Sequence, residues 1–213
     1  RLRRVWAVNG AVHTALAVAC LKVVRYGLYF WLPIQLEMKL GYTTTQAANY
    51  SALFDVGAAV GCLVSGHVLT HLFRSNALVG SAVQTALSAA ALGLFTLATN
   101  YNNTTIVCIS IALIGALNGA PDVILCGIVP AELVADNHDH DTEQKPAEKP
   151  VSAMIGFING LGSLGGVIEG PLVGVIADLT GWTGVSISMI AFSLAGSAFC
   201  MLADRSTKRK ATV

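Results

Sequence analysis

Residues 105–129 read TIVCISIALIGALNGAPDVILCGIV, and Asp122 is the single charged side chain in this run. A membrane-spanning helix needs roughly 17–25 mostly apolar residues, so the run is long enough to cross a bilayer. Similar apolar stretches occupy residues 10–33, 48–70, 77–99, 153–177 and 183–203. We therefore expect an all-α, polytopic membrane protein in which residues 1–213 form a single bundle of six transmembrane helices.

The composition supports a membrane protein over a soluble one. Apolar residues make up 54% of the chain and charged residues 12%, and the mean hydropathy is +0.64. A soluble domain usually carries roughly twice that share of charged residues, because water must wet its surface. The net charge of +1 gives no reason to expect a nucleic-acid partner. A lipid bilayer is the surrounding that fits this composition.

The distribution of lysine and arginine predicts the topology. If both termini are cytoplasmic, the connections and tails on that side hold most of the basic residues outside the spans, whereas Lys39 lies on the other side. Such an asymmetry follows the positive-inside rule. The cytoplasmic set is Arg1, Arg3, Arg4, Arg74, Lys145, Lys149, Arg205, Lys208, Arg209 and Lys210.

Residues 131–152 form the longest polar segment, AELVADNHDHDTEQKPAEKPVS, and we expect a mobile cytoplasmic loop there. Its run His138-Asp139-His140-Asp141 contains side chains that bind divalent metals weakly. A solvated linker explains the same residues better, so we expect neither a metal site nor a cofactor.

Small residues recur four positions apart along three of the expected helices. This spacing places a smooth stripe on one helix face, which lets helices approach closely in lipid. Two prolines lie inside spans, where they weaken the local hydrogen bonding of the helix. The glycines are Gly57/Gly61, Gly115/Gly119 and Gly162/Gly166/Gly170/Gly174, and the prolines are Pro121 and Pro171.

Charged residues inside the first span are the main indication of function. A charge at that depth is costly and usually faces a protein interior, a water-filled cavity or a partner. Lys22, Arg25 and Tyr29 share one face of the helix, with Tyr26 beside them. A guanidinium group matches phosphate or carboxylate with two parallel hydrogen bonds, and a lysine adds a point charge.

Two explanations of these charges remain open, and anion binding is the favoured one. In the other, an acid from a neighbouring span is the structural counter-ion, and Asp55 and Asp122 are the candidate charge partners. Glu169, a further acid within a span, has no assigned role. The spans hold no paired carboxylates, histidine cluster or nucleophile–base pair, so we do not expect an enzyme.

The same residues resemble a known family. The string Lys22-Val-Val-Arg-Tyr-Gly-Leu-Tyr-Phe-Trp-Leu-Pro33 is similar to the seventh helix of organophosphate:phosphate antiporters of the major facilitator superfamily. Ser51-Ala-Leu-Phe-Asp-Val-Gly57 resembles the next helix of the sugar-phosphate exchanger branch, which includes glycerol-3-phosphate permeases and glucose-6-phosphate translocases. Asn159-Gly-Leu-Gly-Ser-Leu-Gly165, followed by Gly170-Pro171-Leu172, resembles the eleventh helix, and Pro130-Ala-Glu-Leu133 lies where the family has a short acidic motif.

The resemblance implies the C-terminal six-helix half of a twelve-helix carrier. It implies exchange of a phosphorylated small metabolite, a sugar phosphate or glycerol-3-phosphate, for inorganic phosphate by alternating access. It also implies that Arg25 occupies the position of an arginine that holds the phosphate in this family. It also implies a partner, either an N-terminal six-helix half in the same or a separate chain or a homodimer mate. The expected location is the endoplasmic reticulum or another cellular membrane.

Two departures from the family pattern favour an alternative. Gly66 and Arg74 fit the loop between the second and third helices of a half, but His71 stands where another charge is expected. The polar segment after the fourth span is also long and acidic. The alternative is a membrane sensor or assembly subunit that keeps the scaffold without transporting.

Overall fold

The computed structural model describes residues 6, 8–73, 76–138 and 148–210, except the side chains of residues 136–138, 148–150 and 209–210. Every element in this part of the chain is helical, which confirms the all-α, polytopic membrane class. The elements are α2 (Ala11–Leu40), α3 (Thr44–Leu72), α4 (Ala77–Asn100), α5 (Thr104–Val123), the π-helix η1 (Ile124–Ile128), α6 (Val129–His138) and α7 (Glu148–Lys210).

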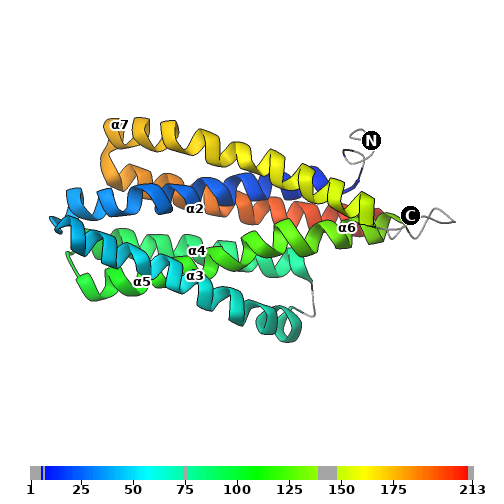
Figure 1. Ribbon diagram of the computed structural model, residues 1–213, viewed down its shortest axis with the longest axis horizontal. Helices are drawn as coiled ribbons and strands as arrows, with labels where there is room; N and C mark the ends of the chain where they lie inside the picture. Colours follow the sequence, from blue (N-terminus) through cyan, green and yellow to red (C-terminus); the bar gives the residue numbers. More distant parts are fainter. Residues whose placement is uncertain (1–5, 7, 74–75, 139–147, 211–213) are drawn as a thin grey trace.

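Helix α7 consists of two helices that run in opposite directions. At Gly181 the backbone takes φ 71° and ψ −177°, a conformation open to glycine but not to residues with a Cβ. The chain turns back there, as the gold-to-orange part of α7 shows (Figure 1). Five stretches are long and apolar enough to cross a membrane, and the last, Val151–Lys208, contains both arms of α7. The break at Gly181 falls between the fifth and sixth expected spans, and the number of membrane crossings stays a prediction.

Most helices extend beyond the apolar runs that identify them. Helix α2 continues past Pro33 to Leu40 and ends at Gly41, whose φ of 67° suits a helix C-cap. Helix α3 begins with a capping box, because the Thr43 side chain accepts from the backbone of Gln46 while the Gln46 side chain accepts from that of Thr43. Where the helices enter and leave the bilayer stays a prediction.

The segment 131–152 is more helical than the expected loop. Helix α6 runs on to His138, and α7 already begins at Glu148. Ala131, Glu132 and Leu133 are good helix formers, and a polar sequence does not by itself end a helix. Residues 139–147 and the His138 side chain lie outside the described residues, so the weak metal motif at residues 138–141 is untested.

Close helix packing occurs where the small residues predict it, between α3 and α5. A methyl group added at Gly57 would overlap the carbonyl oxygen of Ala112, and one at Gly61 would overlap that of Ala116. A methyl group at Gly115 would likewise overlap the carbonyl oxygen of Phe54. Bare backbone at these positions lets the two helices touch along their length.

The four-residue glycine stripe of α7 faces α2 only in part. Gly162 packs on Val18 and Gly166 on the ring of Tyr26, whereas a methyl at Gly170 would meet nothing within 4 Å. The closest backbone approach is instead at Gly165, against Ala19. The reason is geometric: four residues exceed one turn of 3.6, so the stripe drifts around the helix.

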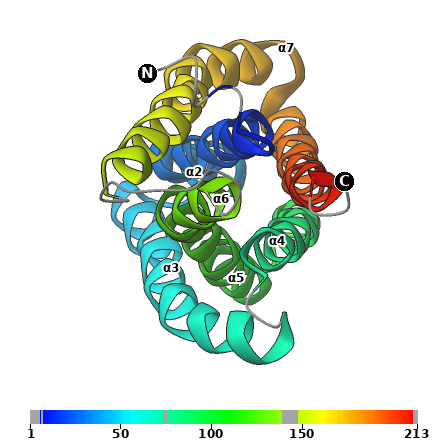
Figure 2. The same ribbon diagram turned by 90° about the vertical axis from the view of Figure 1, so that its right-hand side faces the viewer.

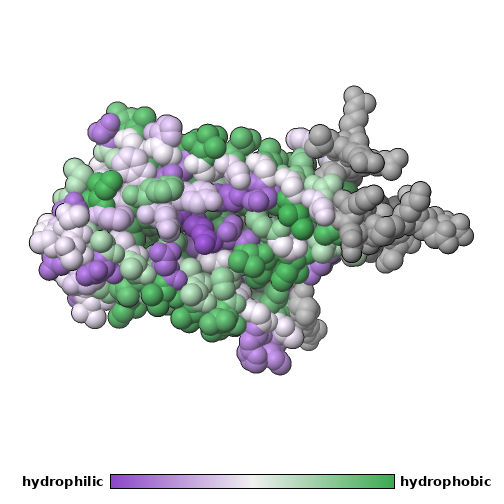
Figure 3. All heavy atoms as spheres, in the orientation of Figure 1, coloured by the Kyte–Doolittle hydropathy of each residue, from purple (hydrophilic) through white to green (hydrophobic). Residues whose placement is uncertain are grey.

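We call one side of the bundle its recessed face, after the arrangement of its helix backbones. In the end view, α3 and the first arm of α7 stand at the edges of that side, with α2 and α6 set back between them (Figure 2). The apolar spans of α3 and α7 are only 28% and 33% buried, against 61% for α4. Hydrophilic residues gather in the middle of this face between two apolar regions (Figure 3). Polar groups that face lipid are costly, so in a membrane bundle they are expected where they face a cavity or a partner.

Candidate functional site

A cluster of polar and charged side chains joins α2 to α5, η1 and α7. Helix α2 contributes Lys22 and Arg25, one turn apart. Helix α5 contributes Asp122, directly after Pro121 and two residues before η1 begins. A π-helix is a local widening of the helix that is frequent at functional sites, and proline removes one backbone hydrogen bond next to it.

Lys22 is buried, with 6% of its surface exposed, and it is held by neutral acceptors on α7. Its ammonium group donates to the Asn159 side-chain oxygen at 2.5 Å, to the Ser163 hydroxyl at 2.9 Å and to the Asn159 carbonyl at 3.4 Å. All three ammonium protons therefore have an acceptor. The charge itself has no carboxylate among these partners.

Arg25 forms an ion pair with Asp122 of α5. Its Nη1 lies 3.0 Å from Asp122 Oδ2, and the two side chains are 30% and 25% exposed. Of the two candidate charge partners, the structure pairs Arg25 with Asp122, while Asp55 is exposed on α3. The structural counter-ion left open by the sequence is thus present, although one ion pair does not exclude a ligand from a partly exposed guanidinium.

The described cluster has one more positive charge than negative charges. Lys22 and Arg25 bring two cations, and Asp122 brings one carboxylate. Asn159 and Ser163 are exposed, so the cluster reaches the surface of the bundle. A partly exposed guanidinium beside an unneutralised lysine provides what an anion needs, a local positive potential and hydrogen-bond donors.

The two tyrosines predicted for this site are on the exposed side of α2. The Tyr26 ring packs against Gly166 of α7 and stacks on Phe30, with ring centroids 6.2 Å apart. Tyr29 is 56% exposed and meets the edge of Phe30 at 5.5 Å. These tyrosines form an aromatic patch with Phe30 next to the charged cluster.

Sequence reasoning missed two residues at or near this site. Cys126 lies in η1 with its sulfur 4.0 Å from oxygens of both Asp122 and Asn159, so it connects the two halves of the cluster. Its position depends on the π-helix, which no pattern in the sequence indicates. Glu169 is 2% exposed between α7 and α2. The sequence shows this residue as a carboxylate within an apolar span, but it does not show which residues the carboxylate faces.

Metal binding has no support in the part of the chain that the structure describes. Within those residues, no group of three or more His, Cys, Asp or Glu side chains is placed to hold a metal ion. His67 and His71 are neighbours on α3, with ring centroids 4.2 Å apart, but no third ligand joins them there.

Comparison with known proteins gives several relatives, while no protein-family model matches the chain. Sugar phosphate exchanger 3 of Mus musculus is 30% identical over 175 residues, and its Homo sapiens counterpart is 29% identical over 173 residues; each alignment covers 81% of this chain. Glucose-6-phosphate exchanger SLC37A2 of Xenopus laevis is 27% identical over 206 residues, or 93% of this chain.

These alignments cover 33–37% of the relatives, so the chain spans about a third of the length of the curated proteins it matches. An alignment over 93% of this chain includes the helices that carry the charged cluster. The resemblance seen in the motifs is confirmed: the chain has homologues among the sugar-phosphate exchangers, which is consistent with the organophosphate:phosphate antiporter family of the major facilitator superfamily.

Proposed function

We propose that the chain is the C-terminal six-helix half of a carrier that exchanges a phosphorylated small metabolite for inorganic phosphate. The metabolite is a sugar phosphate or glycerol-3-phosphate, and the site around Arg25 and Lys22 holds its phosphoryl group. The observation that carries this proposal is the excess positive charge of the cluster within an apolar helix bundle. The names of the relatives, sugar phosphate exchanger and glucose-6-phosphate exchanger, agree with this substrate class.

The mechanism we propose is alternating access. A phosphoryl group entering the site competes with Asp122 for the guanidinium of Arg25, because both are anions that accept from the same fork. Organophosphate and phosphate then use one site in turn, and a carrier of two halves rocks around it. The relatives are named as exchangers, which fits a protein without a catalytic step of its own.

The recessed face is where we place the second half of the carrier. It is formed by a separate region of six helices, in the same or another chain, or by a second copy of this chain. Relatives about three times the aligned length leave room for such a half. We also propose that both termini are cytoplasmic and that the membrane is that of the endoplasmic reticulum or another cellular compartment.

Exchange in liposomes tests this function. The chain is reconstituted together with the second half of the carrier in phosphate-loaded vesicles, and efflux of labelled phosphate is followed against external glucose-6-phosphate and glycerol-3-phosphate. We expect exchange that Arg25→Ala abolishes. Lys39→Ala is the matched control, because Lys39 is a cation at the far end of the same helix, bonded to Thr183. Exchange that survives Arg25→Ala contradicts the assigned site.

A second candidate, the sensor or assembly subunit, predicts a different result. A folded chain that binds phosphate but exchanges none, with and without an added N-terminal half, favours that candidate. The two departures from the family pattern, at His71 and in the long acidic segment after the fourth span, are the reason to test for it.

A further inference from the structure

Glu169 is a buried acid with an unused hydrogen-bond acceptor. It lies on α7 with 2% of its surface exposed, and its Oε1 has no hydrogen-bond partner. It reaches α2 at Gly27, where an added Cβ would lie 3.4 Å from the same oxygen. A buried polar atom without a partner costs free energy, so a native structure that keeps one needs a reason for it.

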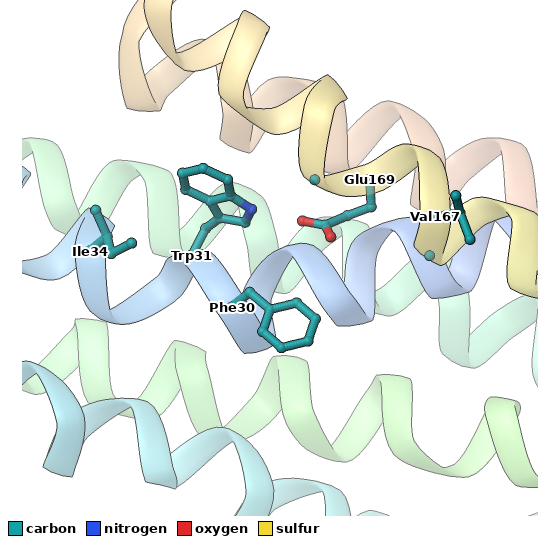
Figure 4. Close-up of a pocket in the computed structure, with 7 residues that line it drawn as sticks. Phe30, Trp31, Ile34, Val167 and Glu169 are labelled. Atoms are coloured by element: carbon teal, nitrogen blue, oxygen red, sulfur yellow. The ribbon is translucent and has the colours of Figure 1, made fainter.

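The carboxylate borders a pocket between α2 and α7. The pocket has a volume of about 470 Å³, within the range typical of small-molecule sites, roughly 300–1,000 Å³. Its other lining residues are Phe30, Trp31 and Ile34 of α2 and Gly166, Val167 and Gly170 of α7. The indole nitrogen of Trp31 points toward the Glu169 carboxylate, and the Phe30 ring lies below both in this view (Figure 4). An added methyl at Gly170 would enter open space.

This set of groups suits a ligand that carries hydroxyl groups on a carbon skeleton. A carboxylate oxygen accepts hydroxyl hydrogens in strong, charge-assisted bonds. Trp31 and Phe30 offer apolar ring surfaces to C–H groups of such a ligand. A phosphate ion has neither many hydroxyl hydrogens nor an apolar face, and its negative charge is repelled by an ionised Glu169.

The pocket lies within reach of the charged cluster. Arg25 and Trp31 are six residues apart on α2, a rise of roughly 9 Å along the helix. Arg25 turns toward α5, whereas the pocket lies toward α7. The α2 face between them carries the exposed rings of Tyr26, Tyr29 and Phe30, so a ligand that extends from one to the other crosses this aromatic patch.

We propose that the Glu169–Trp31 pocket binds the hydroxyl-bearing part of the phosphorylated ligand, with Glu169 accepting from its hydroxyl groups and Trp31 covering its carbon skeleton. The inference rests on the proposed function, since Arg25 and Lys22 hold the phosphoryl end. It assigns discrimination between an organophosphate and inorganic phosphate to α7 rather than to the phosphate-holding cations.

Binding measured by calorimetry on the chain in lipid nanodiscs tests this assignment, with glucose-6-phosphate and inorganic phosphate as ligands. Glu169→Gln keeps the size of the side chain but removes its charge, and Gly170→Leu fills the pocket. We expect each variant to weaken glucose-6-phosphate binding about tenfold, the difference between a charge-assisted and a neutral hydrogen bond, and to leave phosphate binding unchanged. The matched control is Gly156→Leu, on the same helix with nothing within 4 Å of an added Cβ.

The possible results separate the two proposals. If both variants leave glucose-6-phosphate binding unchanged, or weaken phosphate to the same extent, the hydroxyl-binding pocket is contradicted while the anion site stands. Unchanged binding would also be the result if Glu169 serves only a neighbouring protein segment. If the unmodified, folded chain binds neither ligand, the proposed function itself fails, and the pocket assignment fails with it.

Discussion

At the scale of single residues, the two cations of α2 are held in different ways. Lys22 is buried, and all of its described bonds go to neutral acceptors of α7. Arg25 is partly exposed and bonded to a carboxylate of α5 through one nitrogen of its fork. The first arrangement suits a structural cation that also raises the local potential. The second suits a group that exchanges one anionic partner for another.

Neutralising Asp122 is therefore expected to strengthen anion binding. Asp122→Asn removes the carboxylate that competes with a ligand for Arg25 and leaves two uncompensated cations in the cluster. We expect phosphate to bind about tenfold more tightly, since the loss of one charge-assisted competitor is worth about 1.4 kcal/mol or more. Calorimetry in nanodiscs measures this. Asp55→Asn, an exposed acid on α3, is the control, and weaker binding by Asp122→Asn would show that Asp122 positions Arg25 instead.

Removing the Lys22 ammonium is expected to destabilise the bundle. Lys22→Met removes the charge-assisted hydrogen bonds to Asn159 and Ser163, and a hydrogen bond to a charged group contributes roughly 1.5–3 kcal/mol. Thermal unfolding in detergent should begin at a lower temperature than for the unmodified chain. Arg25→Met is the comparison and should change stability less, since both members of its ion pair are partly exposed. Equal unfolding temperatures for Lys22→Met and the unmodified chain would exclude the structural role.

The sequence identified the cations but not the state of their surroundings. Lys22, Arg25 and Asp122 were recognisable because charges are rare in apolar spans. Which acid pairs with Arg25 depends on how α2 and α5 are oriented, and the sequence left Asp55 and Asp122 equally open. Glu169 was visible as an acid, but its unpaired oxygen follows from the approach of α7 to Gly27, a contact between distant parts of the chain.

At the scale of helices, the contact between α3 and α5 depends on glycine. An alanine at position 115 would place its methyl group against the carbonyl oxygen of Phe54 on α3. Two helix backbones have little room to yield, so the helices must separate. This contact was predictable, because small residues at a spacing of four on both helices indicate close packing.

Gly115→Ala is expected to lower the stability of the bundle by about 1–3 kcal/mol, the usual cost of overpacking. Gly93→Ala on α4 is the matched control, because a methyl group there meets nothing within 4 Å. That control should be neutral or stabilising by up to about 1 kcal/mol, as alanine favours a helix over glycine. Thermal unfolding of both variants in the same detergent gives the comparison. If both variants behave alike, the contact is looser than the structure has it.

Hydropathy predicted the apolar part of each helix but not where the helix ends. Helix α2 continues beyond the span 10–33 as far as Leu40, and a glycine C-cap rather than polarity ends it. Helix α6 enters the polar segment 131–152 because its residues are helix formers. Apolar runs report burial in lipid, whereas helix ends depend on caps and backbone conformation.

At the scale of the whole molecule, the connections divide between two ends of the bundle. The turn between α2 and α3, the turn between α4 and α5 and the break at Gly181 lie at one end. The end of α3, the start of α4 and the ends of α6 and the second arm of α7 lie at the other (Figure 1). Because Arg205 and Lys208 are in the last turns of α7, at the second end, and Lys39 is at the end of α2, near the first, the second end is the one we propose to be cytoplasmic.

Accessibility of single cysteines tests this orientation. The five native cysteines are free in the structure, so replacing them by alanine breaks no disulfide. Gly41→Cys and Asn102→Cys then report on one end, and Phe73→Cys and Arg205→Cys on the other. In sealed membranes of one orientation, a membrane-impermeant maleimide should label one of these pairs, and detergent should expose the second.

The even number of crossings between Gly41 and Asn102, and again between Phe73 and Arg205, requires the members of each pair to behave alike. In right-side-out membranes, labelling of Gly41→Cys and Asn102→Cys, without labelling of Phe73→Cys and Arg205→Cys, supports cytoplasmic termini. Labelling of Arg205→Cys there would invert the orientation, against the positive-inside rule. Labelling of Asn102→Cys together with Arg205→Cys would mean that the chain does not cross the bilayer at each of the six apolar segments. The recessed face would then be unable to line a pathway from one side of the membrane to the other.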